Sequence, residues 1–330
     1  MDKERNIIRV GPVHAGIIEP GVFEFECTGE RVVECSVQLG YQHRGIEALI
    51  VKAAQSPLTM MCLSEQIAGD STIAHATAMA QILESGVGCN NLIKNERIVG
   101  QELERMAMDI ADLAALSGDI AYESTKAVCE AQRTLVINCL QRLCGNRFGR
   151  TLIRPAGSHY RIDDTKCDDI LETTEGVAKQ LTRVGNTLMN SPQVLGRLEE
   201  LCIVKEGYGR FSGDLKSRVT ARLREIQEAQ QLIAITIKEL QRNRYDDHSA
   251  PNYSIVLPPN SELSATANGY RGEVRHSCKT SSEGLITEYH ITDPSAELWA
   301  VLMESMKDGA LSDFPINNKS FNLSYCAVDK

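Results

Sequence analysis

Ser71 and His75 are residues whose types and spacing could do chemistry. Residues four apart lie on one face of a helix, so the hydroxyl could meet the imidazole as a nucleophile beside a base. An activated serine also needs an acid that orients the base and donors that hold an oxyanion. The segment alone supplies neither, so the pair predicts an ordinary structural contact more strongly than a hydrolase site.

Eleven cysteines are a second candidate set, because thiolates bind zinc and iron–sulfur clusters. None of them forms a Cys-x-x-Cys pair, and the closest two are Cys139 and Cys144. An odd number also argues against a disulfide framework. We therefore expect most of them to be small buried hydrophobic residues. Phosphate-binding loops and a Gly-x-Ser-x-Gly elbow are also absent from the sequence.

The elements that must position any site are mostly helices. Apolar residues at helical spacing, such as Leu103, Met106 and Ile110, predict packed helices over several long segments. We expect these helices at 61–85, 96–118, 121–143, 166–190 and 216–242. Alternating Val- and Phe-rich runs at 7–39 predict a small sheet. After a polar linker at 242–251 we expect strands at 253–257, 271–279 and 285–291, a helix at 294–306 and an irregular tail.

This pattern predicts an α+β fold that is mainly α. A helical bundle at 44–242 is flanked by a β element at 1–43 and by a β/α segment and tail at 243–330. We expect the last segment to pack back on the bundle, so that the chain forms one structural domain.

Charge and hydropathy exclude several classes of protein. The formal net charge is -9 at pH 7, which gives no overall attraction for a nucleic-acid backbone. No apolar run approaches the roughly 20 residues of a membrane span, and the start of the chain is charged where a signal peptide is apolar. We therefore expect a cytoplasmic protein that contacts a membrane only through partner subunits.

Short motifs follow one another along the chain, and their order carries more information than any one of them. They are Gly-Pro-Val-His at 11–14, Glu-Pro-Gly at 19–21, Gly-Tyr-Gln-His-Arg-Gly-Ile-Glu at 40–47, Gly-Asn-Arg-Phe-Gly-Arg at 145–150 with Arg-Pro-Ala-Gly at 154–157, Gly-Tyr-Arg-Gly-Glu at 269–273 and Asp-Phe-Pro at 313–315. This order resembles the family that joins the large subunits of membrane-bound, energy-converting [NiFe] hydrogenases to the 49 kDa-type subunit of respiratory complex I. The resemblance implies a helical bundle core with flanking β structure.

The same resemblance shows what this chain lacks. Hydrogenases of the family hold nickel through an early Cys-Gly-x-Cys-x-x-x-His motif and a late Asp-Pro-Cys-x-x-Cys motif. Here the first pair of cysteine positions holds Ala68 and Ser71, ahead of His75, and the second pair holds Ser324 and Ala327. Hydroxyl and methyl groups cannot replace the soft thiolates that hold nickel. The resemblance therefore implies no metal and no other cofactor in this chain, as in the energy-converting hydrogenase-related complexes.

The resemblance also implies partners and a function. We expect a subunit of a membrane-associated oxidoreductase that couples electron transfer to proton or other ion translocation. Its partners are an iron–sulfur small subunit with a [4Fe–4S] cluster and antiporter-like membrane subunits, and it lies peripherally on the cytoplasmic face. His43 and Arg44 match the region that faces the iron–sulfur subunit, with helix capping and packing as the alternative.

Five residues are candidate cavity or proton-relay residues by the same resemblance. His14 and Glu19 lie on the loop at the floor of the family's cavity, Asp70 and His75 face the vacated metal position, and Arg271 matches the arginine that reaches over the active site. The alternative for these groups is a polar plug whose hydrogen bonds fill a remnant cavity. The structural alternative for Glu19 is a solvated acid on a loop, and that for His14 is a histidine bonded to backbone in a tight turn.

Two other functions remain open at this level. Quinone reduction as in complex I is one alternative, with His14, Glu19 and His75 as substitute donors. It is weakened because the tyrosine of the quinone site falls on Gly69 and the second loop histidine falls near 17–18. The other alternative is a non-catalytic scaffold that transmits conformational change between the cluster subunit and the membrane subunits.

Overall fold

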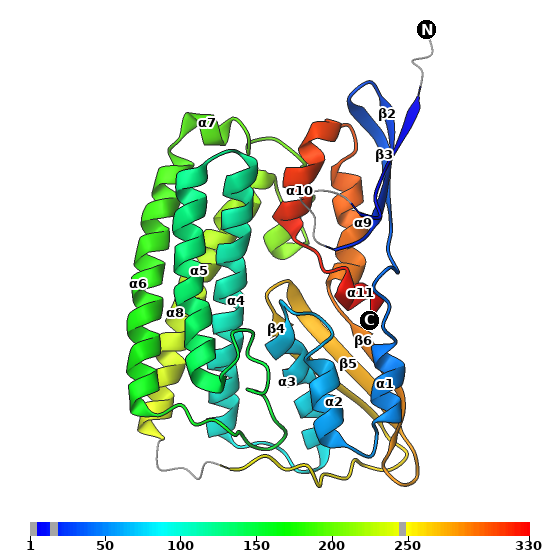
Figure 1. Ribbon diagram of the computed structural model, residues 1–330, viewed down its shortest axis with the longest axis vertical. Coiled ribbons are helices and arrows are strands. Elements are labelled where there is room, and N and C mark those ends of the chain that lie inside the picture. Colours follow the sequence, from blue (N-terminus) through cyan, green and yellow to red (C-terminus); the bar gives the residue numbers. More distant parts are fainter. Residues whose placement is uncertain (1–4, 14–18, 244–248) are drawn as a thin grey trace.

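The computed structural model describes residues 5–13, 19–243 and 249–330. A bundle of long helices occupies one half of the molecule (Figure 1). Helix α4 packs against α5 and α8, and α6 packs against the same two helices, which closes a ring. The predicted stripe of Leu103, Met106 and Ile110 on α4 is fully buried. The bundle helices are α4 (Asn91–Asp119), α5 (Glu123–Cys144), α6 (Asp164–Met189) and α8 (Leu215–Arg242).

Side-chain caps fix where three of these helices begin. The side chain of Asn90 accepts a hydrogen bond from the Ile93 amide at 2.9 Å. Asp163 and Asp214 do the same for α6 and α8. A side-chain oxygen at this position pairs an amide that the helix leaves free. Helix α5 ends at Gly145, whose φ of 75° suits glycine.

The other half of the molecule holds two small antiparallel sheets. The first, with order β1-β2-β3, packs on α9 and α10 through a second core that contains Phe23, Phe25 and Trp299. The second, with order β4-β5-β6, is covered by α1 and α3. The strands are β1 (Asn6–Val10), β2 (Val22–Thr28), β3 (Arg31–Gln38), β4 (Glu262–Gly269), β5 (Gly272–Thr280) and β6 (Ile286–Thr292).

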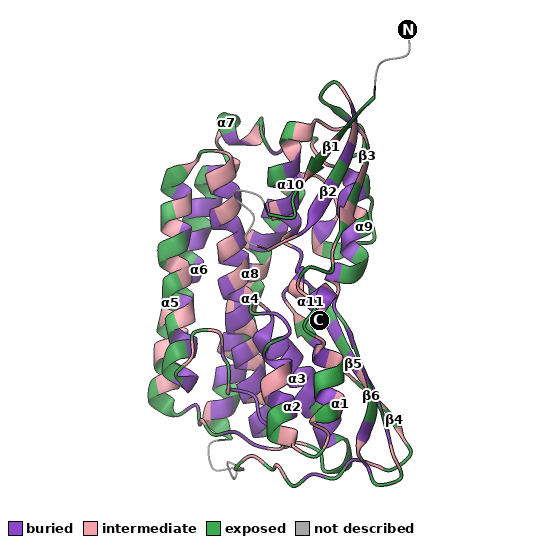
Figure 2. Cartoon of the chain, turned by 45° about the vertical axis from the view of Figure 1, so that its right-hand side comes forward, coloured by how far each residue is buried: buried purple, intermediate pink, exposed green. Residues whose placement is uncertain are grey.

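Short helices connect the two halves and bring the end of the chain between them (Figure 1). They are α1 (Ile46–Lys52), α2 (Pro57–Ser64), α3 (Thr72–Leu83), α7 (Pro192–Leu195), α9 (Ser295–Ser305), α10 (Phe314–Phe321) and α11 (Cys326–Asp329), with 3-10 turns η1 (Glu84–Gly86), η2 (Gly209–Phe211) and η3 (Leu311–Asp313). Figure 2 shows that α3 is buried along nearly its whole length, whereas α5 and α6 expose one face. Helix α3 is thus a central element between the bundle and the second sheet.

The predicted fold class, mainly α with small flanking sheets, is confirmed. Three details were wrong. The segment 61–85 is two helices, because the chain turns at 65–71 between α2 and α3. Residues 253–257 form no strand, and the missed strand β4 pairs with β5 through small residues that lack the usual strand signal. The tail forms α10 and α11. No helix in the described ranges is both long and apolar enough to cross a bilayer.

Candidate functional site

The two segments that match the family's metal-binding motifs lie side by side. Arg44 joins them, because its guanidinium donates to the carbonyl oxygens of Ile67 at 2.8 Å and Cys326 at 3.0 Å. The positions matched to the lost cysteines are buried, and they are Ala68, Ser71, Ser324 and Ala327. The geometry therefore brings together the four positions that the resemblance singles out.

Asp70 and Arg271 form a two-pronged ion pair beside these segments. Both terminal nitrogens of Arg271 donate to the Asp70 carboxylate, one of them at 3.1 Å, and Nε donates to the Asn322 carbonyl at 2.5 Å. Burial alone would lower the pKa of Arg271, but the negative charge of Asp70 raises it well above its usual value. The Arg271 side chain is 2% exposed and that of Asp70 is 27% exposed. Asp70 is thus the accessible half of a fixed pair.

The donor set at the four positions does not fit a nickel–iron centre. Ser324 Oγ accepts the Ala327 amide at 3.1 Å, so this hydroxyl caps the start of α11. The nearby Cys326 thiol, 3.4 Å from Ser324 Oγ, has its pKa raised to about 11 by burial and by the charge of Glu19. Cys326 lies one residue before Ala327 and outside the four matched positions, so its thiol does not restore the lost set. In the described part of the chain, no group of three or more His, Cys, Asp and Glu side chains could hold a metal ion.

Glu19 contacts the same tail from the opposite side. Its carboxylate accepts the backbone amide of Tyr325 at 3.1 Å. This contact brings the predicted loop acid against the second vestigial segment. His14, the other predicted residue of this loop, lies outside the described residues, as do residues 17–18.

His75 does not join Asp70, contrary to the arrangement expected from the resemblance. Its ring is fully buried, with Nδ1 3.0 Å from His276 Nε2 and Nε2 3.5 Å from Asp293 Oδ2. Nδ1 thus pairs with His276 and Nε2 faces Asp293, so neither ring nitrogen is directed to Ser71 as the base of a nucleophile would be. His276 was missed, although strand alternation at 274, 276 and 278 places it on the buried face of β5.

Glu104 is a second site residue that sequence reasoning missed. Its carboxylate accepts the amides of Ile73 at 2.7 Å and Ala74 at 3.3 Å, at the start of α3. Burial raises the pKa of Glu104 to about 8 although these two amides lower it, and the charge of Asp70 raises it further. The signal for it was an acid at 104 on the buried stripe of the helix predicted at 96–118, one residue from Leu103.

An ion pair between Arg154 and Glu65 gives the Arg-Pro-Ala-Gly motif at 154–157 a structural role. Arg154 Nη1 donates to Glu65 Oε1 at 2.6 Å, and the Thr151 amide donates to the same oxygen at 2.7 Å. Both side chains are buried. The motif at 154–157 thus anchors the turn between α2 and α3, which carries Ala68 and Asp70.

His43 and Arg44 make internal contacts but keep exposed surface. His43 Nδ1 lies 2.7 Å from the carbonyl oxygen of Asp329, and the Asp329 carboxylate accepts the amides of Gly40 and Gln42. Packing of this strand-to-helix junction against the end of the chain is therefore observed. The contact with an iron–sulfur subunit stays a prediction.

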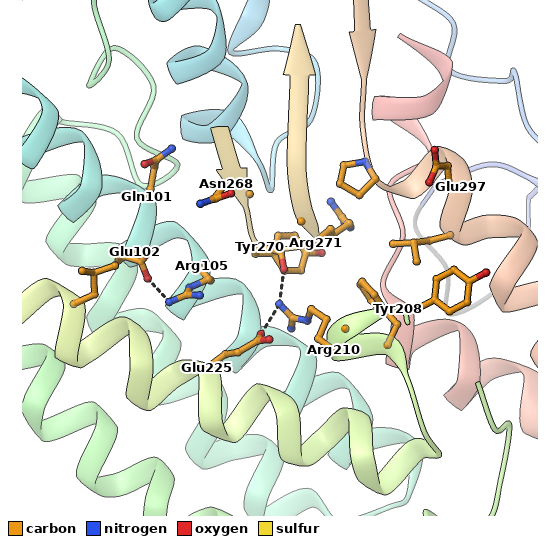
Figure 3. A pocket seen from close by; sticks show the side chains of 17 residues that line it. Gln101, Glu102, Arg105, Tyr208, Arg210, Glu225, Asn268, Tyr270, Arg271 and Glu297 are labelled. Carbon is orange, nitrogen blue, oxygen red and sulfur yellow. Dashed lines mark hydrogen bonds and ion pairs between the residues drawn. The ribbon is translucent and has the colours of Figure 1, made fainter. Parts of the chain in front are cut away.

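A charged pocket of about 580 Å³ borders the ion pair (Figure 3). Arg271 lines it and also binds Asp70, so this side chain connects the pocket with the vestigial segments. Arg210 also lines the pocket, with Nη1 2.8 Å from Glu225 Oε2. Burial raises the pKa of Tyr270, which stacks under the Arg271 guanidinium at 4.4 Å and stays a neutral phenol. The pocket opens between α4, α8, the β4–β5 turn and the start of α9.

Comparison with known proteins finds relatives of this chain among subunits of respiratory and hydrogenase complexes. The chain is 25% identical to the membrane-bound hydrogenase subunit alpha of Pyrococcus furiosus, over 60% of this chain and 46% of that subunit. It is 26% identical to formate hydrogenlyase subunit 5 of Escherichia coli, over 60% of this chain and 36% of that subunit. It is 22% identical to the 49 kDa-type subunit of the NADH-quinone oxidoreductase of Bacillus cereus, over 87% of this chain and 88% of that subunit. No protein-family model matches the chain.

A solved structure shares the whole fold. A chain of the membrane-bound sulfane sulfur reductase, an archaeal respiratory membrane complex, superposes with a TM-score of 0.85 at 18% identity and covers 100% of both chains. The resemblance predicted from the motifs is thereby confirmed: homologues of this chain are large subunits of energy-converting hydrogenases and the 49 kDa-type subunit of NADH-quinone oxidoreductase. The chain aligns with less than half the length of the Pyrococcus and Escherichia hydrogenase subunits.

Proposed function

We propose that this chain is the hydrogenase-like large subunit, without a nickel site of its own, of a membrane-associated oxidoreductase related to complex I. An adjacent iron–sulfur subunit with a [4Fe–4S] cluster delivers electrons to an acceptor at the Asp70–Arg271 pair. Antiporter-like membrane subunits use the released free energy to move ions, and this chain stands on the cytoplasmic face of the assembly.

The observation that carries this proposal is that the four matched positions hold no thiolate and lie beside the fixed Asp70–Arg271 pair. Alanine and serine occupy the positions of the four cysteines, and the serine hydroxyl of Ser324 is committed to a backbone amide. The framework that surrounds them is retained, because Arg44 still joins the two segments. A large subunit of this kind would use its charged groups to bind an acceptor instead of a metal.

The surface beside Asp70 is open at Gly69, which is exposed. A Cβ added to Gly69 would meet no atom of the described residues within 4 Å. Gly69 is also the position matched to the tyrosine of the complex I quinone site, so this chain has no phenol at that exposed position. A ligand there would meet the exposed edge of Asp70, and the pocket beyond Arg271 offers a second approach.

Two acceptor classes are favoured by the comparisons. The NADH-quinone oxidoreductase relatives suggest a quinone, which takes two electrons and two protons to become a quinol. The structural neighbour suggests sulfane sulfur, in which two electrons break a sulfur–sulfur bond and protons complete the products. Both reactions consume protons, which suits a site bordered by the carboxyl groups of Asp70 and Glu104.

Re-oxidation of the reduced cluster in the purified complex tests the proposal. The complex is isolated with this chain and its partners, reduced, mixed with either a soluble quinone or a polysulfide, and followed by the electron paramagnetic resonance signal of the cluster. We expect one acceptor to re-oxidise the cluster. The variant Asp70→Asn keeps the shape of the side chain but removes the charge opposite Arg271, and should slow that step at least tenfold.

Glu273→Gln is the matched control, because Glu273 is an exposed acid two residues beyond Arg271. Its re-oxidation rate should equal that of the unmodified complex. If an acceptor works equally well in Asp70→Asn, the reaction takes place elsewhere, and this chain is the scaffold that transmits conformational change. If neither acceptor works and no iron–sulfur subunit co-purifies, the proposed assembly itself is wrong.

A further inference from the structure

Three buried side chains form a continuous hydrogen-bonded chain behind the Asp70–Arg271 pair. Tyr289 Oη lies 2.7 Å from His276 Nδ1, and His276 Nε2 lies 3.0 Å from His75 Nδ1. At the far end His75 Nε2 faces Asp293 Oδ2 at 3.5 Å. His75 and His276 are each 0% exposed, so water does not compete for these contacts. Buried imidazoles that contact each other are costly unless their protons are arranged consistently.

The geometry allows one consistent arrangement for the neutral chain. Burial raises the pKa of Tyr289 well above its usual value, so the phenol keeps its proton and donates to His276 Nδ1. His276 then carries its proton on Nε2 and donates to His75 Nδ1, and His75 carries its proton on Nε2 toward Asp293. All three donors point the same way, from β6 toward the start of α9.

Only one hydrogen fits between the two rings at 3.0 Å. When a proton is added to His75, its Nδ1 becomes the donor, His276 moves its proton to Nδ1 and the Tyr289 hydroxyl turns toward Met79 Sδ, which lies 3.6 Å away. The hydrogen bonds between His75, His276 and Tyr289 reverse direction, His75 Nε2 keeps its proton toward Asp293, and the chain gains one positive charge. A second proton would put two N–H groups against each other, so the pair holds one.

Charged groups of both signs surround the pair, and His75 faces the carboxylate of Asp293. Burial would raise the pKa of Asp293, but the hydrogen bond and charge of His75 lower it, so the carboxylate stays negative. Burial and the charge of His75 lower the pKa of His276 well below its usual value. The other charged or titratable groups around the chain are Lys330 near His276, Glu47 and Cys278 near Tyr289, Arg271 near Asp293, and Glu104 at the start of α3.

The negative end of the chain adjoins the candidate site. Asp293 Oδ1 accepts the Ser295 amide at 2.8 Å, and Ser295 Oγ in turn accepts the amide of Ser324 at 3.0 Å. Arg271 is close enough to influence the pKa of Asp293. The hydrogen-bonded chain therefore ends between the vestigial segment at Ser324 and the Asp70–Arg271 pair.

We propose that His75 and His276 form a buried site for one proton, held by the chain Tyr289–His276–His75–Asp293 beside the Asp70–Arg271 pair. Proton uptake adds one proton and one positive charge, and no electron moves. The use of that proton in reducing an acceptor rests on the proposed function, whereas the proton site itself does not.

Histidine nitrogen spectra of the full chain test this proposal without any acceptor. Long-range ¹H–¹⁵N correlation distinguishes the two neutral tautomers and the charged ring, and the variants His75→Gln and His276→Gln assign the signals. At high pH we expect both rings to carry their proton on Nε2. As the pH falls, both rings should change together in one step that corresponds to a single proton.

The matched control is His290→Gln, since His290 is exposed on β6 next to Tyr289 and should leave that step unchanged. Tyr289→Phe keeps the shape of the core but removes the donor that sets the direction, so His276 should then populate both tautomers. Independent titration of the two rings, or no proton uptake between about pH 5 and 9, overturns the proposal. A failed acceptor assay leaves it standing, because the spectra report protons alone.

Discussion

Replacing Asp112 by alanine should lower the free energy of unfolding of the chain by about 3–5 kcal/mol. Asp112 Oδ2 accepts Arg222 Nε at 2.8 Å in a pair whose side chains are 1% and 0% exposed. Its other oxygen accepts a hydrogen bond from the side-chain amide of Asn322 at 2.6 Å. The alanine variant leaves the buried guanidinium of Arg222 without its counter-charge. It also removes a hydrogen bond that holds Asn322, whose backbone carbonyl accepts Arg271 Nε. Denaturant unfolding of the full chain, followed by circular dichroism, measures the loss.

Two further variants separate the charge effect from the packing effect. Asp112→Ala combined with Arg222→Met removes both charges and should recover part of the loss, because no unpaired ion remains. Glu288→Ala breaks the exposed pair with Lys279, whose side chains are both 51% exposed, and should change the unfolding midpoint little. If the Asp112→Ala midpoint were equally close to that of the unmodified chain, the buried pair between α4 and α8 would not stabilise the bundle.

Replacing Arg271 by methionine should slow acceptor-dependent re-oxidation of the cluster about 100-fold in the purified complex. Methionine fills much of the same space but cannot donate to Asp70 or to the Asn322 carbonyl. Asp70 is then left without its fixed partner, close to the carboxyl of Glu104. Lysine at 271 keeps the charge without the planar fork, so its rate should fall between the two.

Arg275→Gln is the control for this experiment, because Arg275 is an exposed arginine on β5, the strand that follows Arg271, and it pairs with Glu273 at 3.2 Å. Circular dichroism and the cluster content of the complex show whether each variant is assembled. An assembled Arg271→Met complex that re-oxidises at the normal rate would remove the ion pair from the reaction.

The sequence predicted the bundle well because its signal is local. A stripe such as Leu103, Met106 and Ile110 reports the buried face of a helix without knowledge of its neighbours, and the observed α4 contains it. Strand β4 was missed for the opposite reason. Its small residues gain their stability from pairing with β5 and packing against α3, which no local pattern records.

The candidate site, too, could be predicted from the sequence only in part. The family resemblance singled out Ala68, Ser71, Ser324 and Ala327, and the structure brings their segments together. Spacing could not show that Asp70 pairs with Arg271, 201 positions away. It also could not show that His75 turns from the site toward His276, because that contact is set by how β5 packs on α3.

The metal content of the purified complex tests the central claim most directly. Elemental analysis should find iron from the cluster-bearing partner but no stoichiometric nickel, because Ala68, Ser71, Ser324 and Ala327 offer no thiolate. One nickel atom per copy of this chain, retained after chelation and gel filtration, would contradict the account.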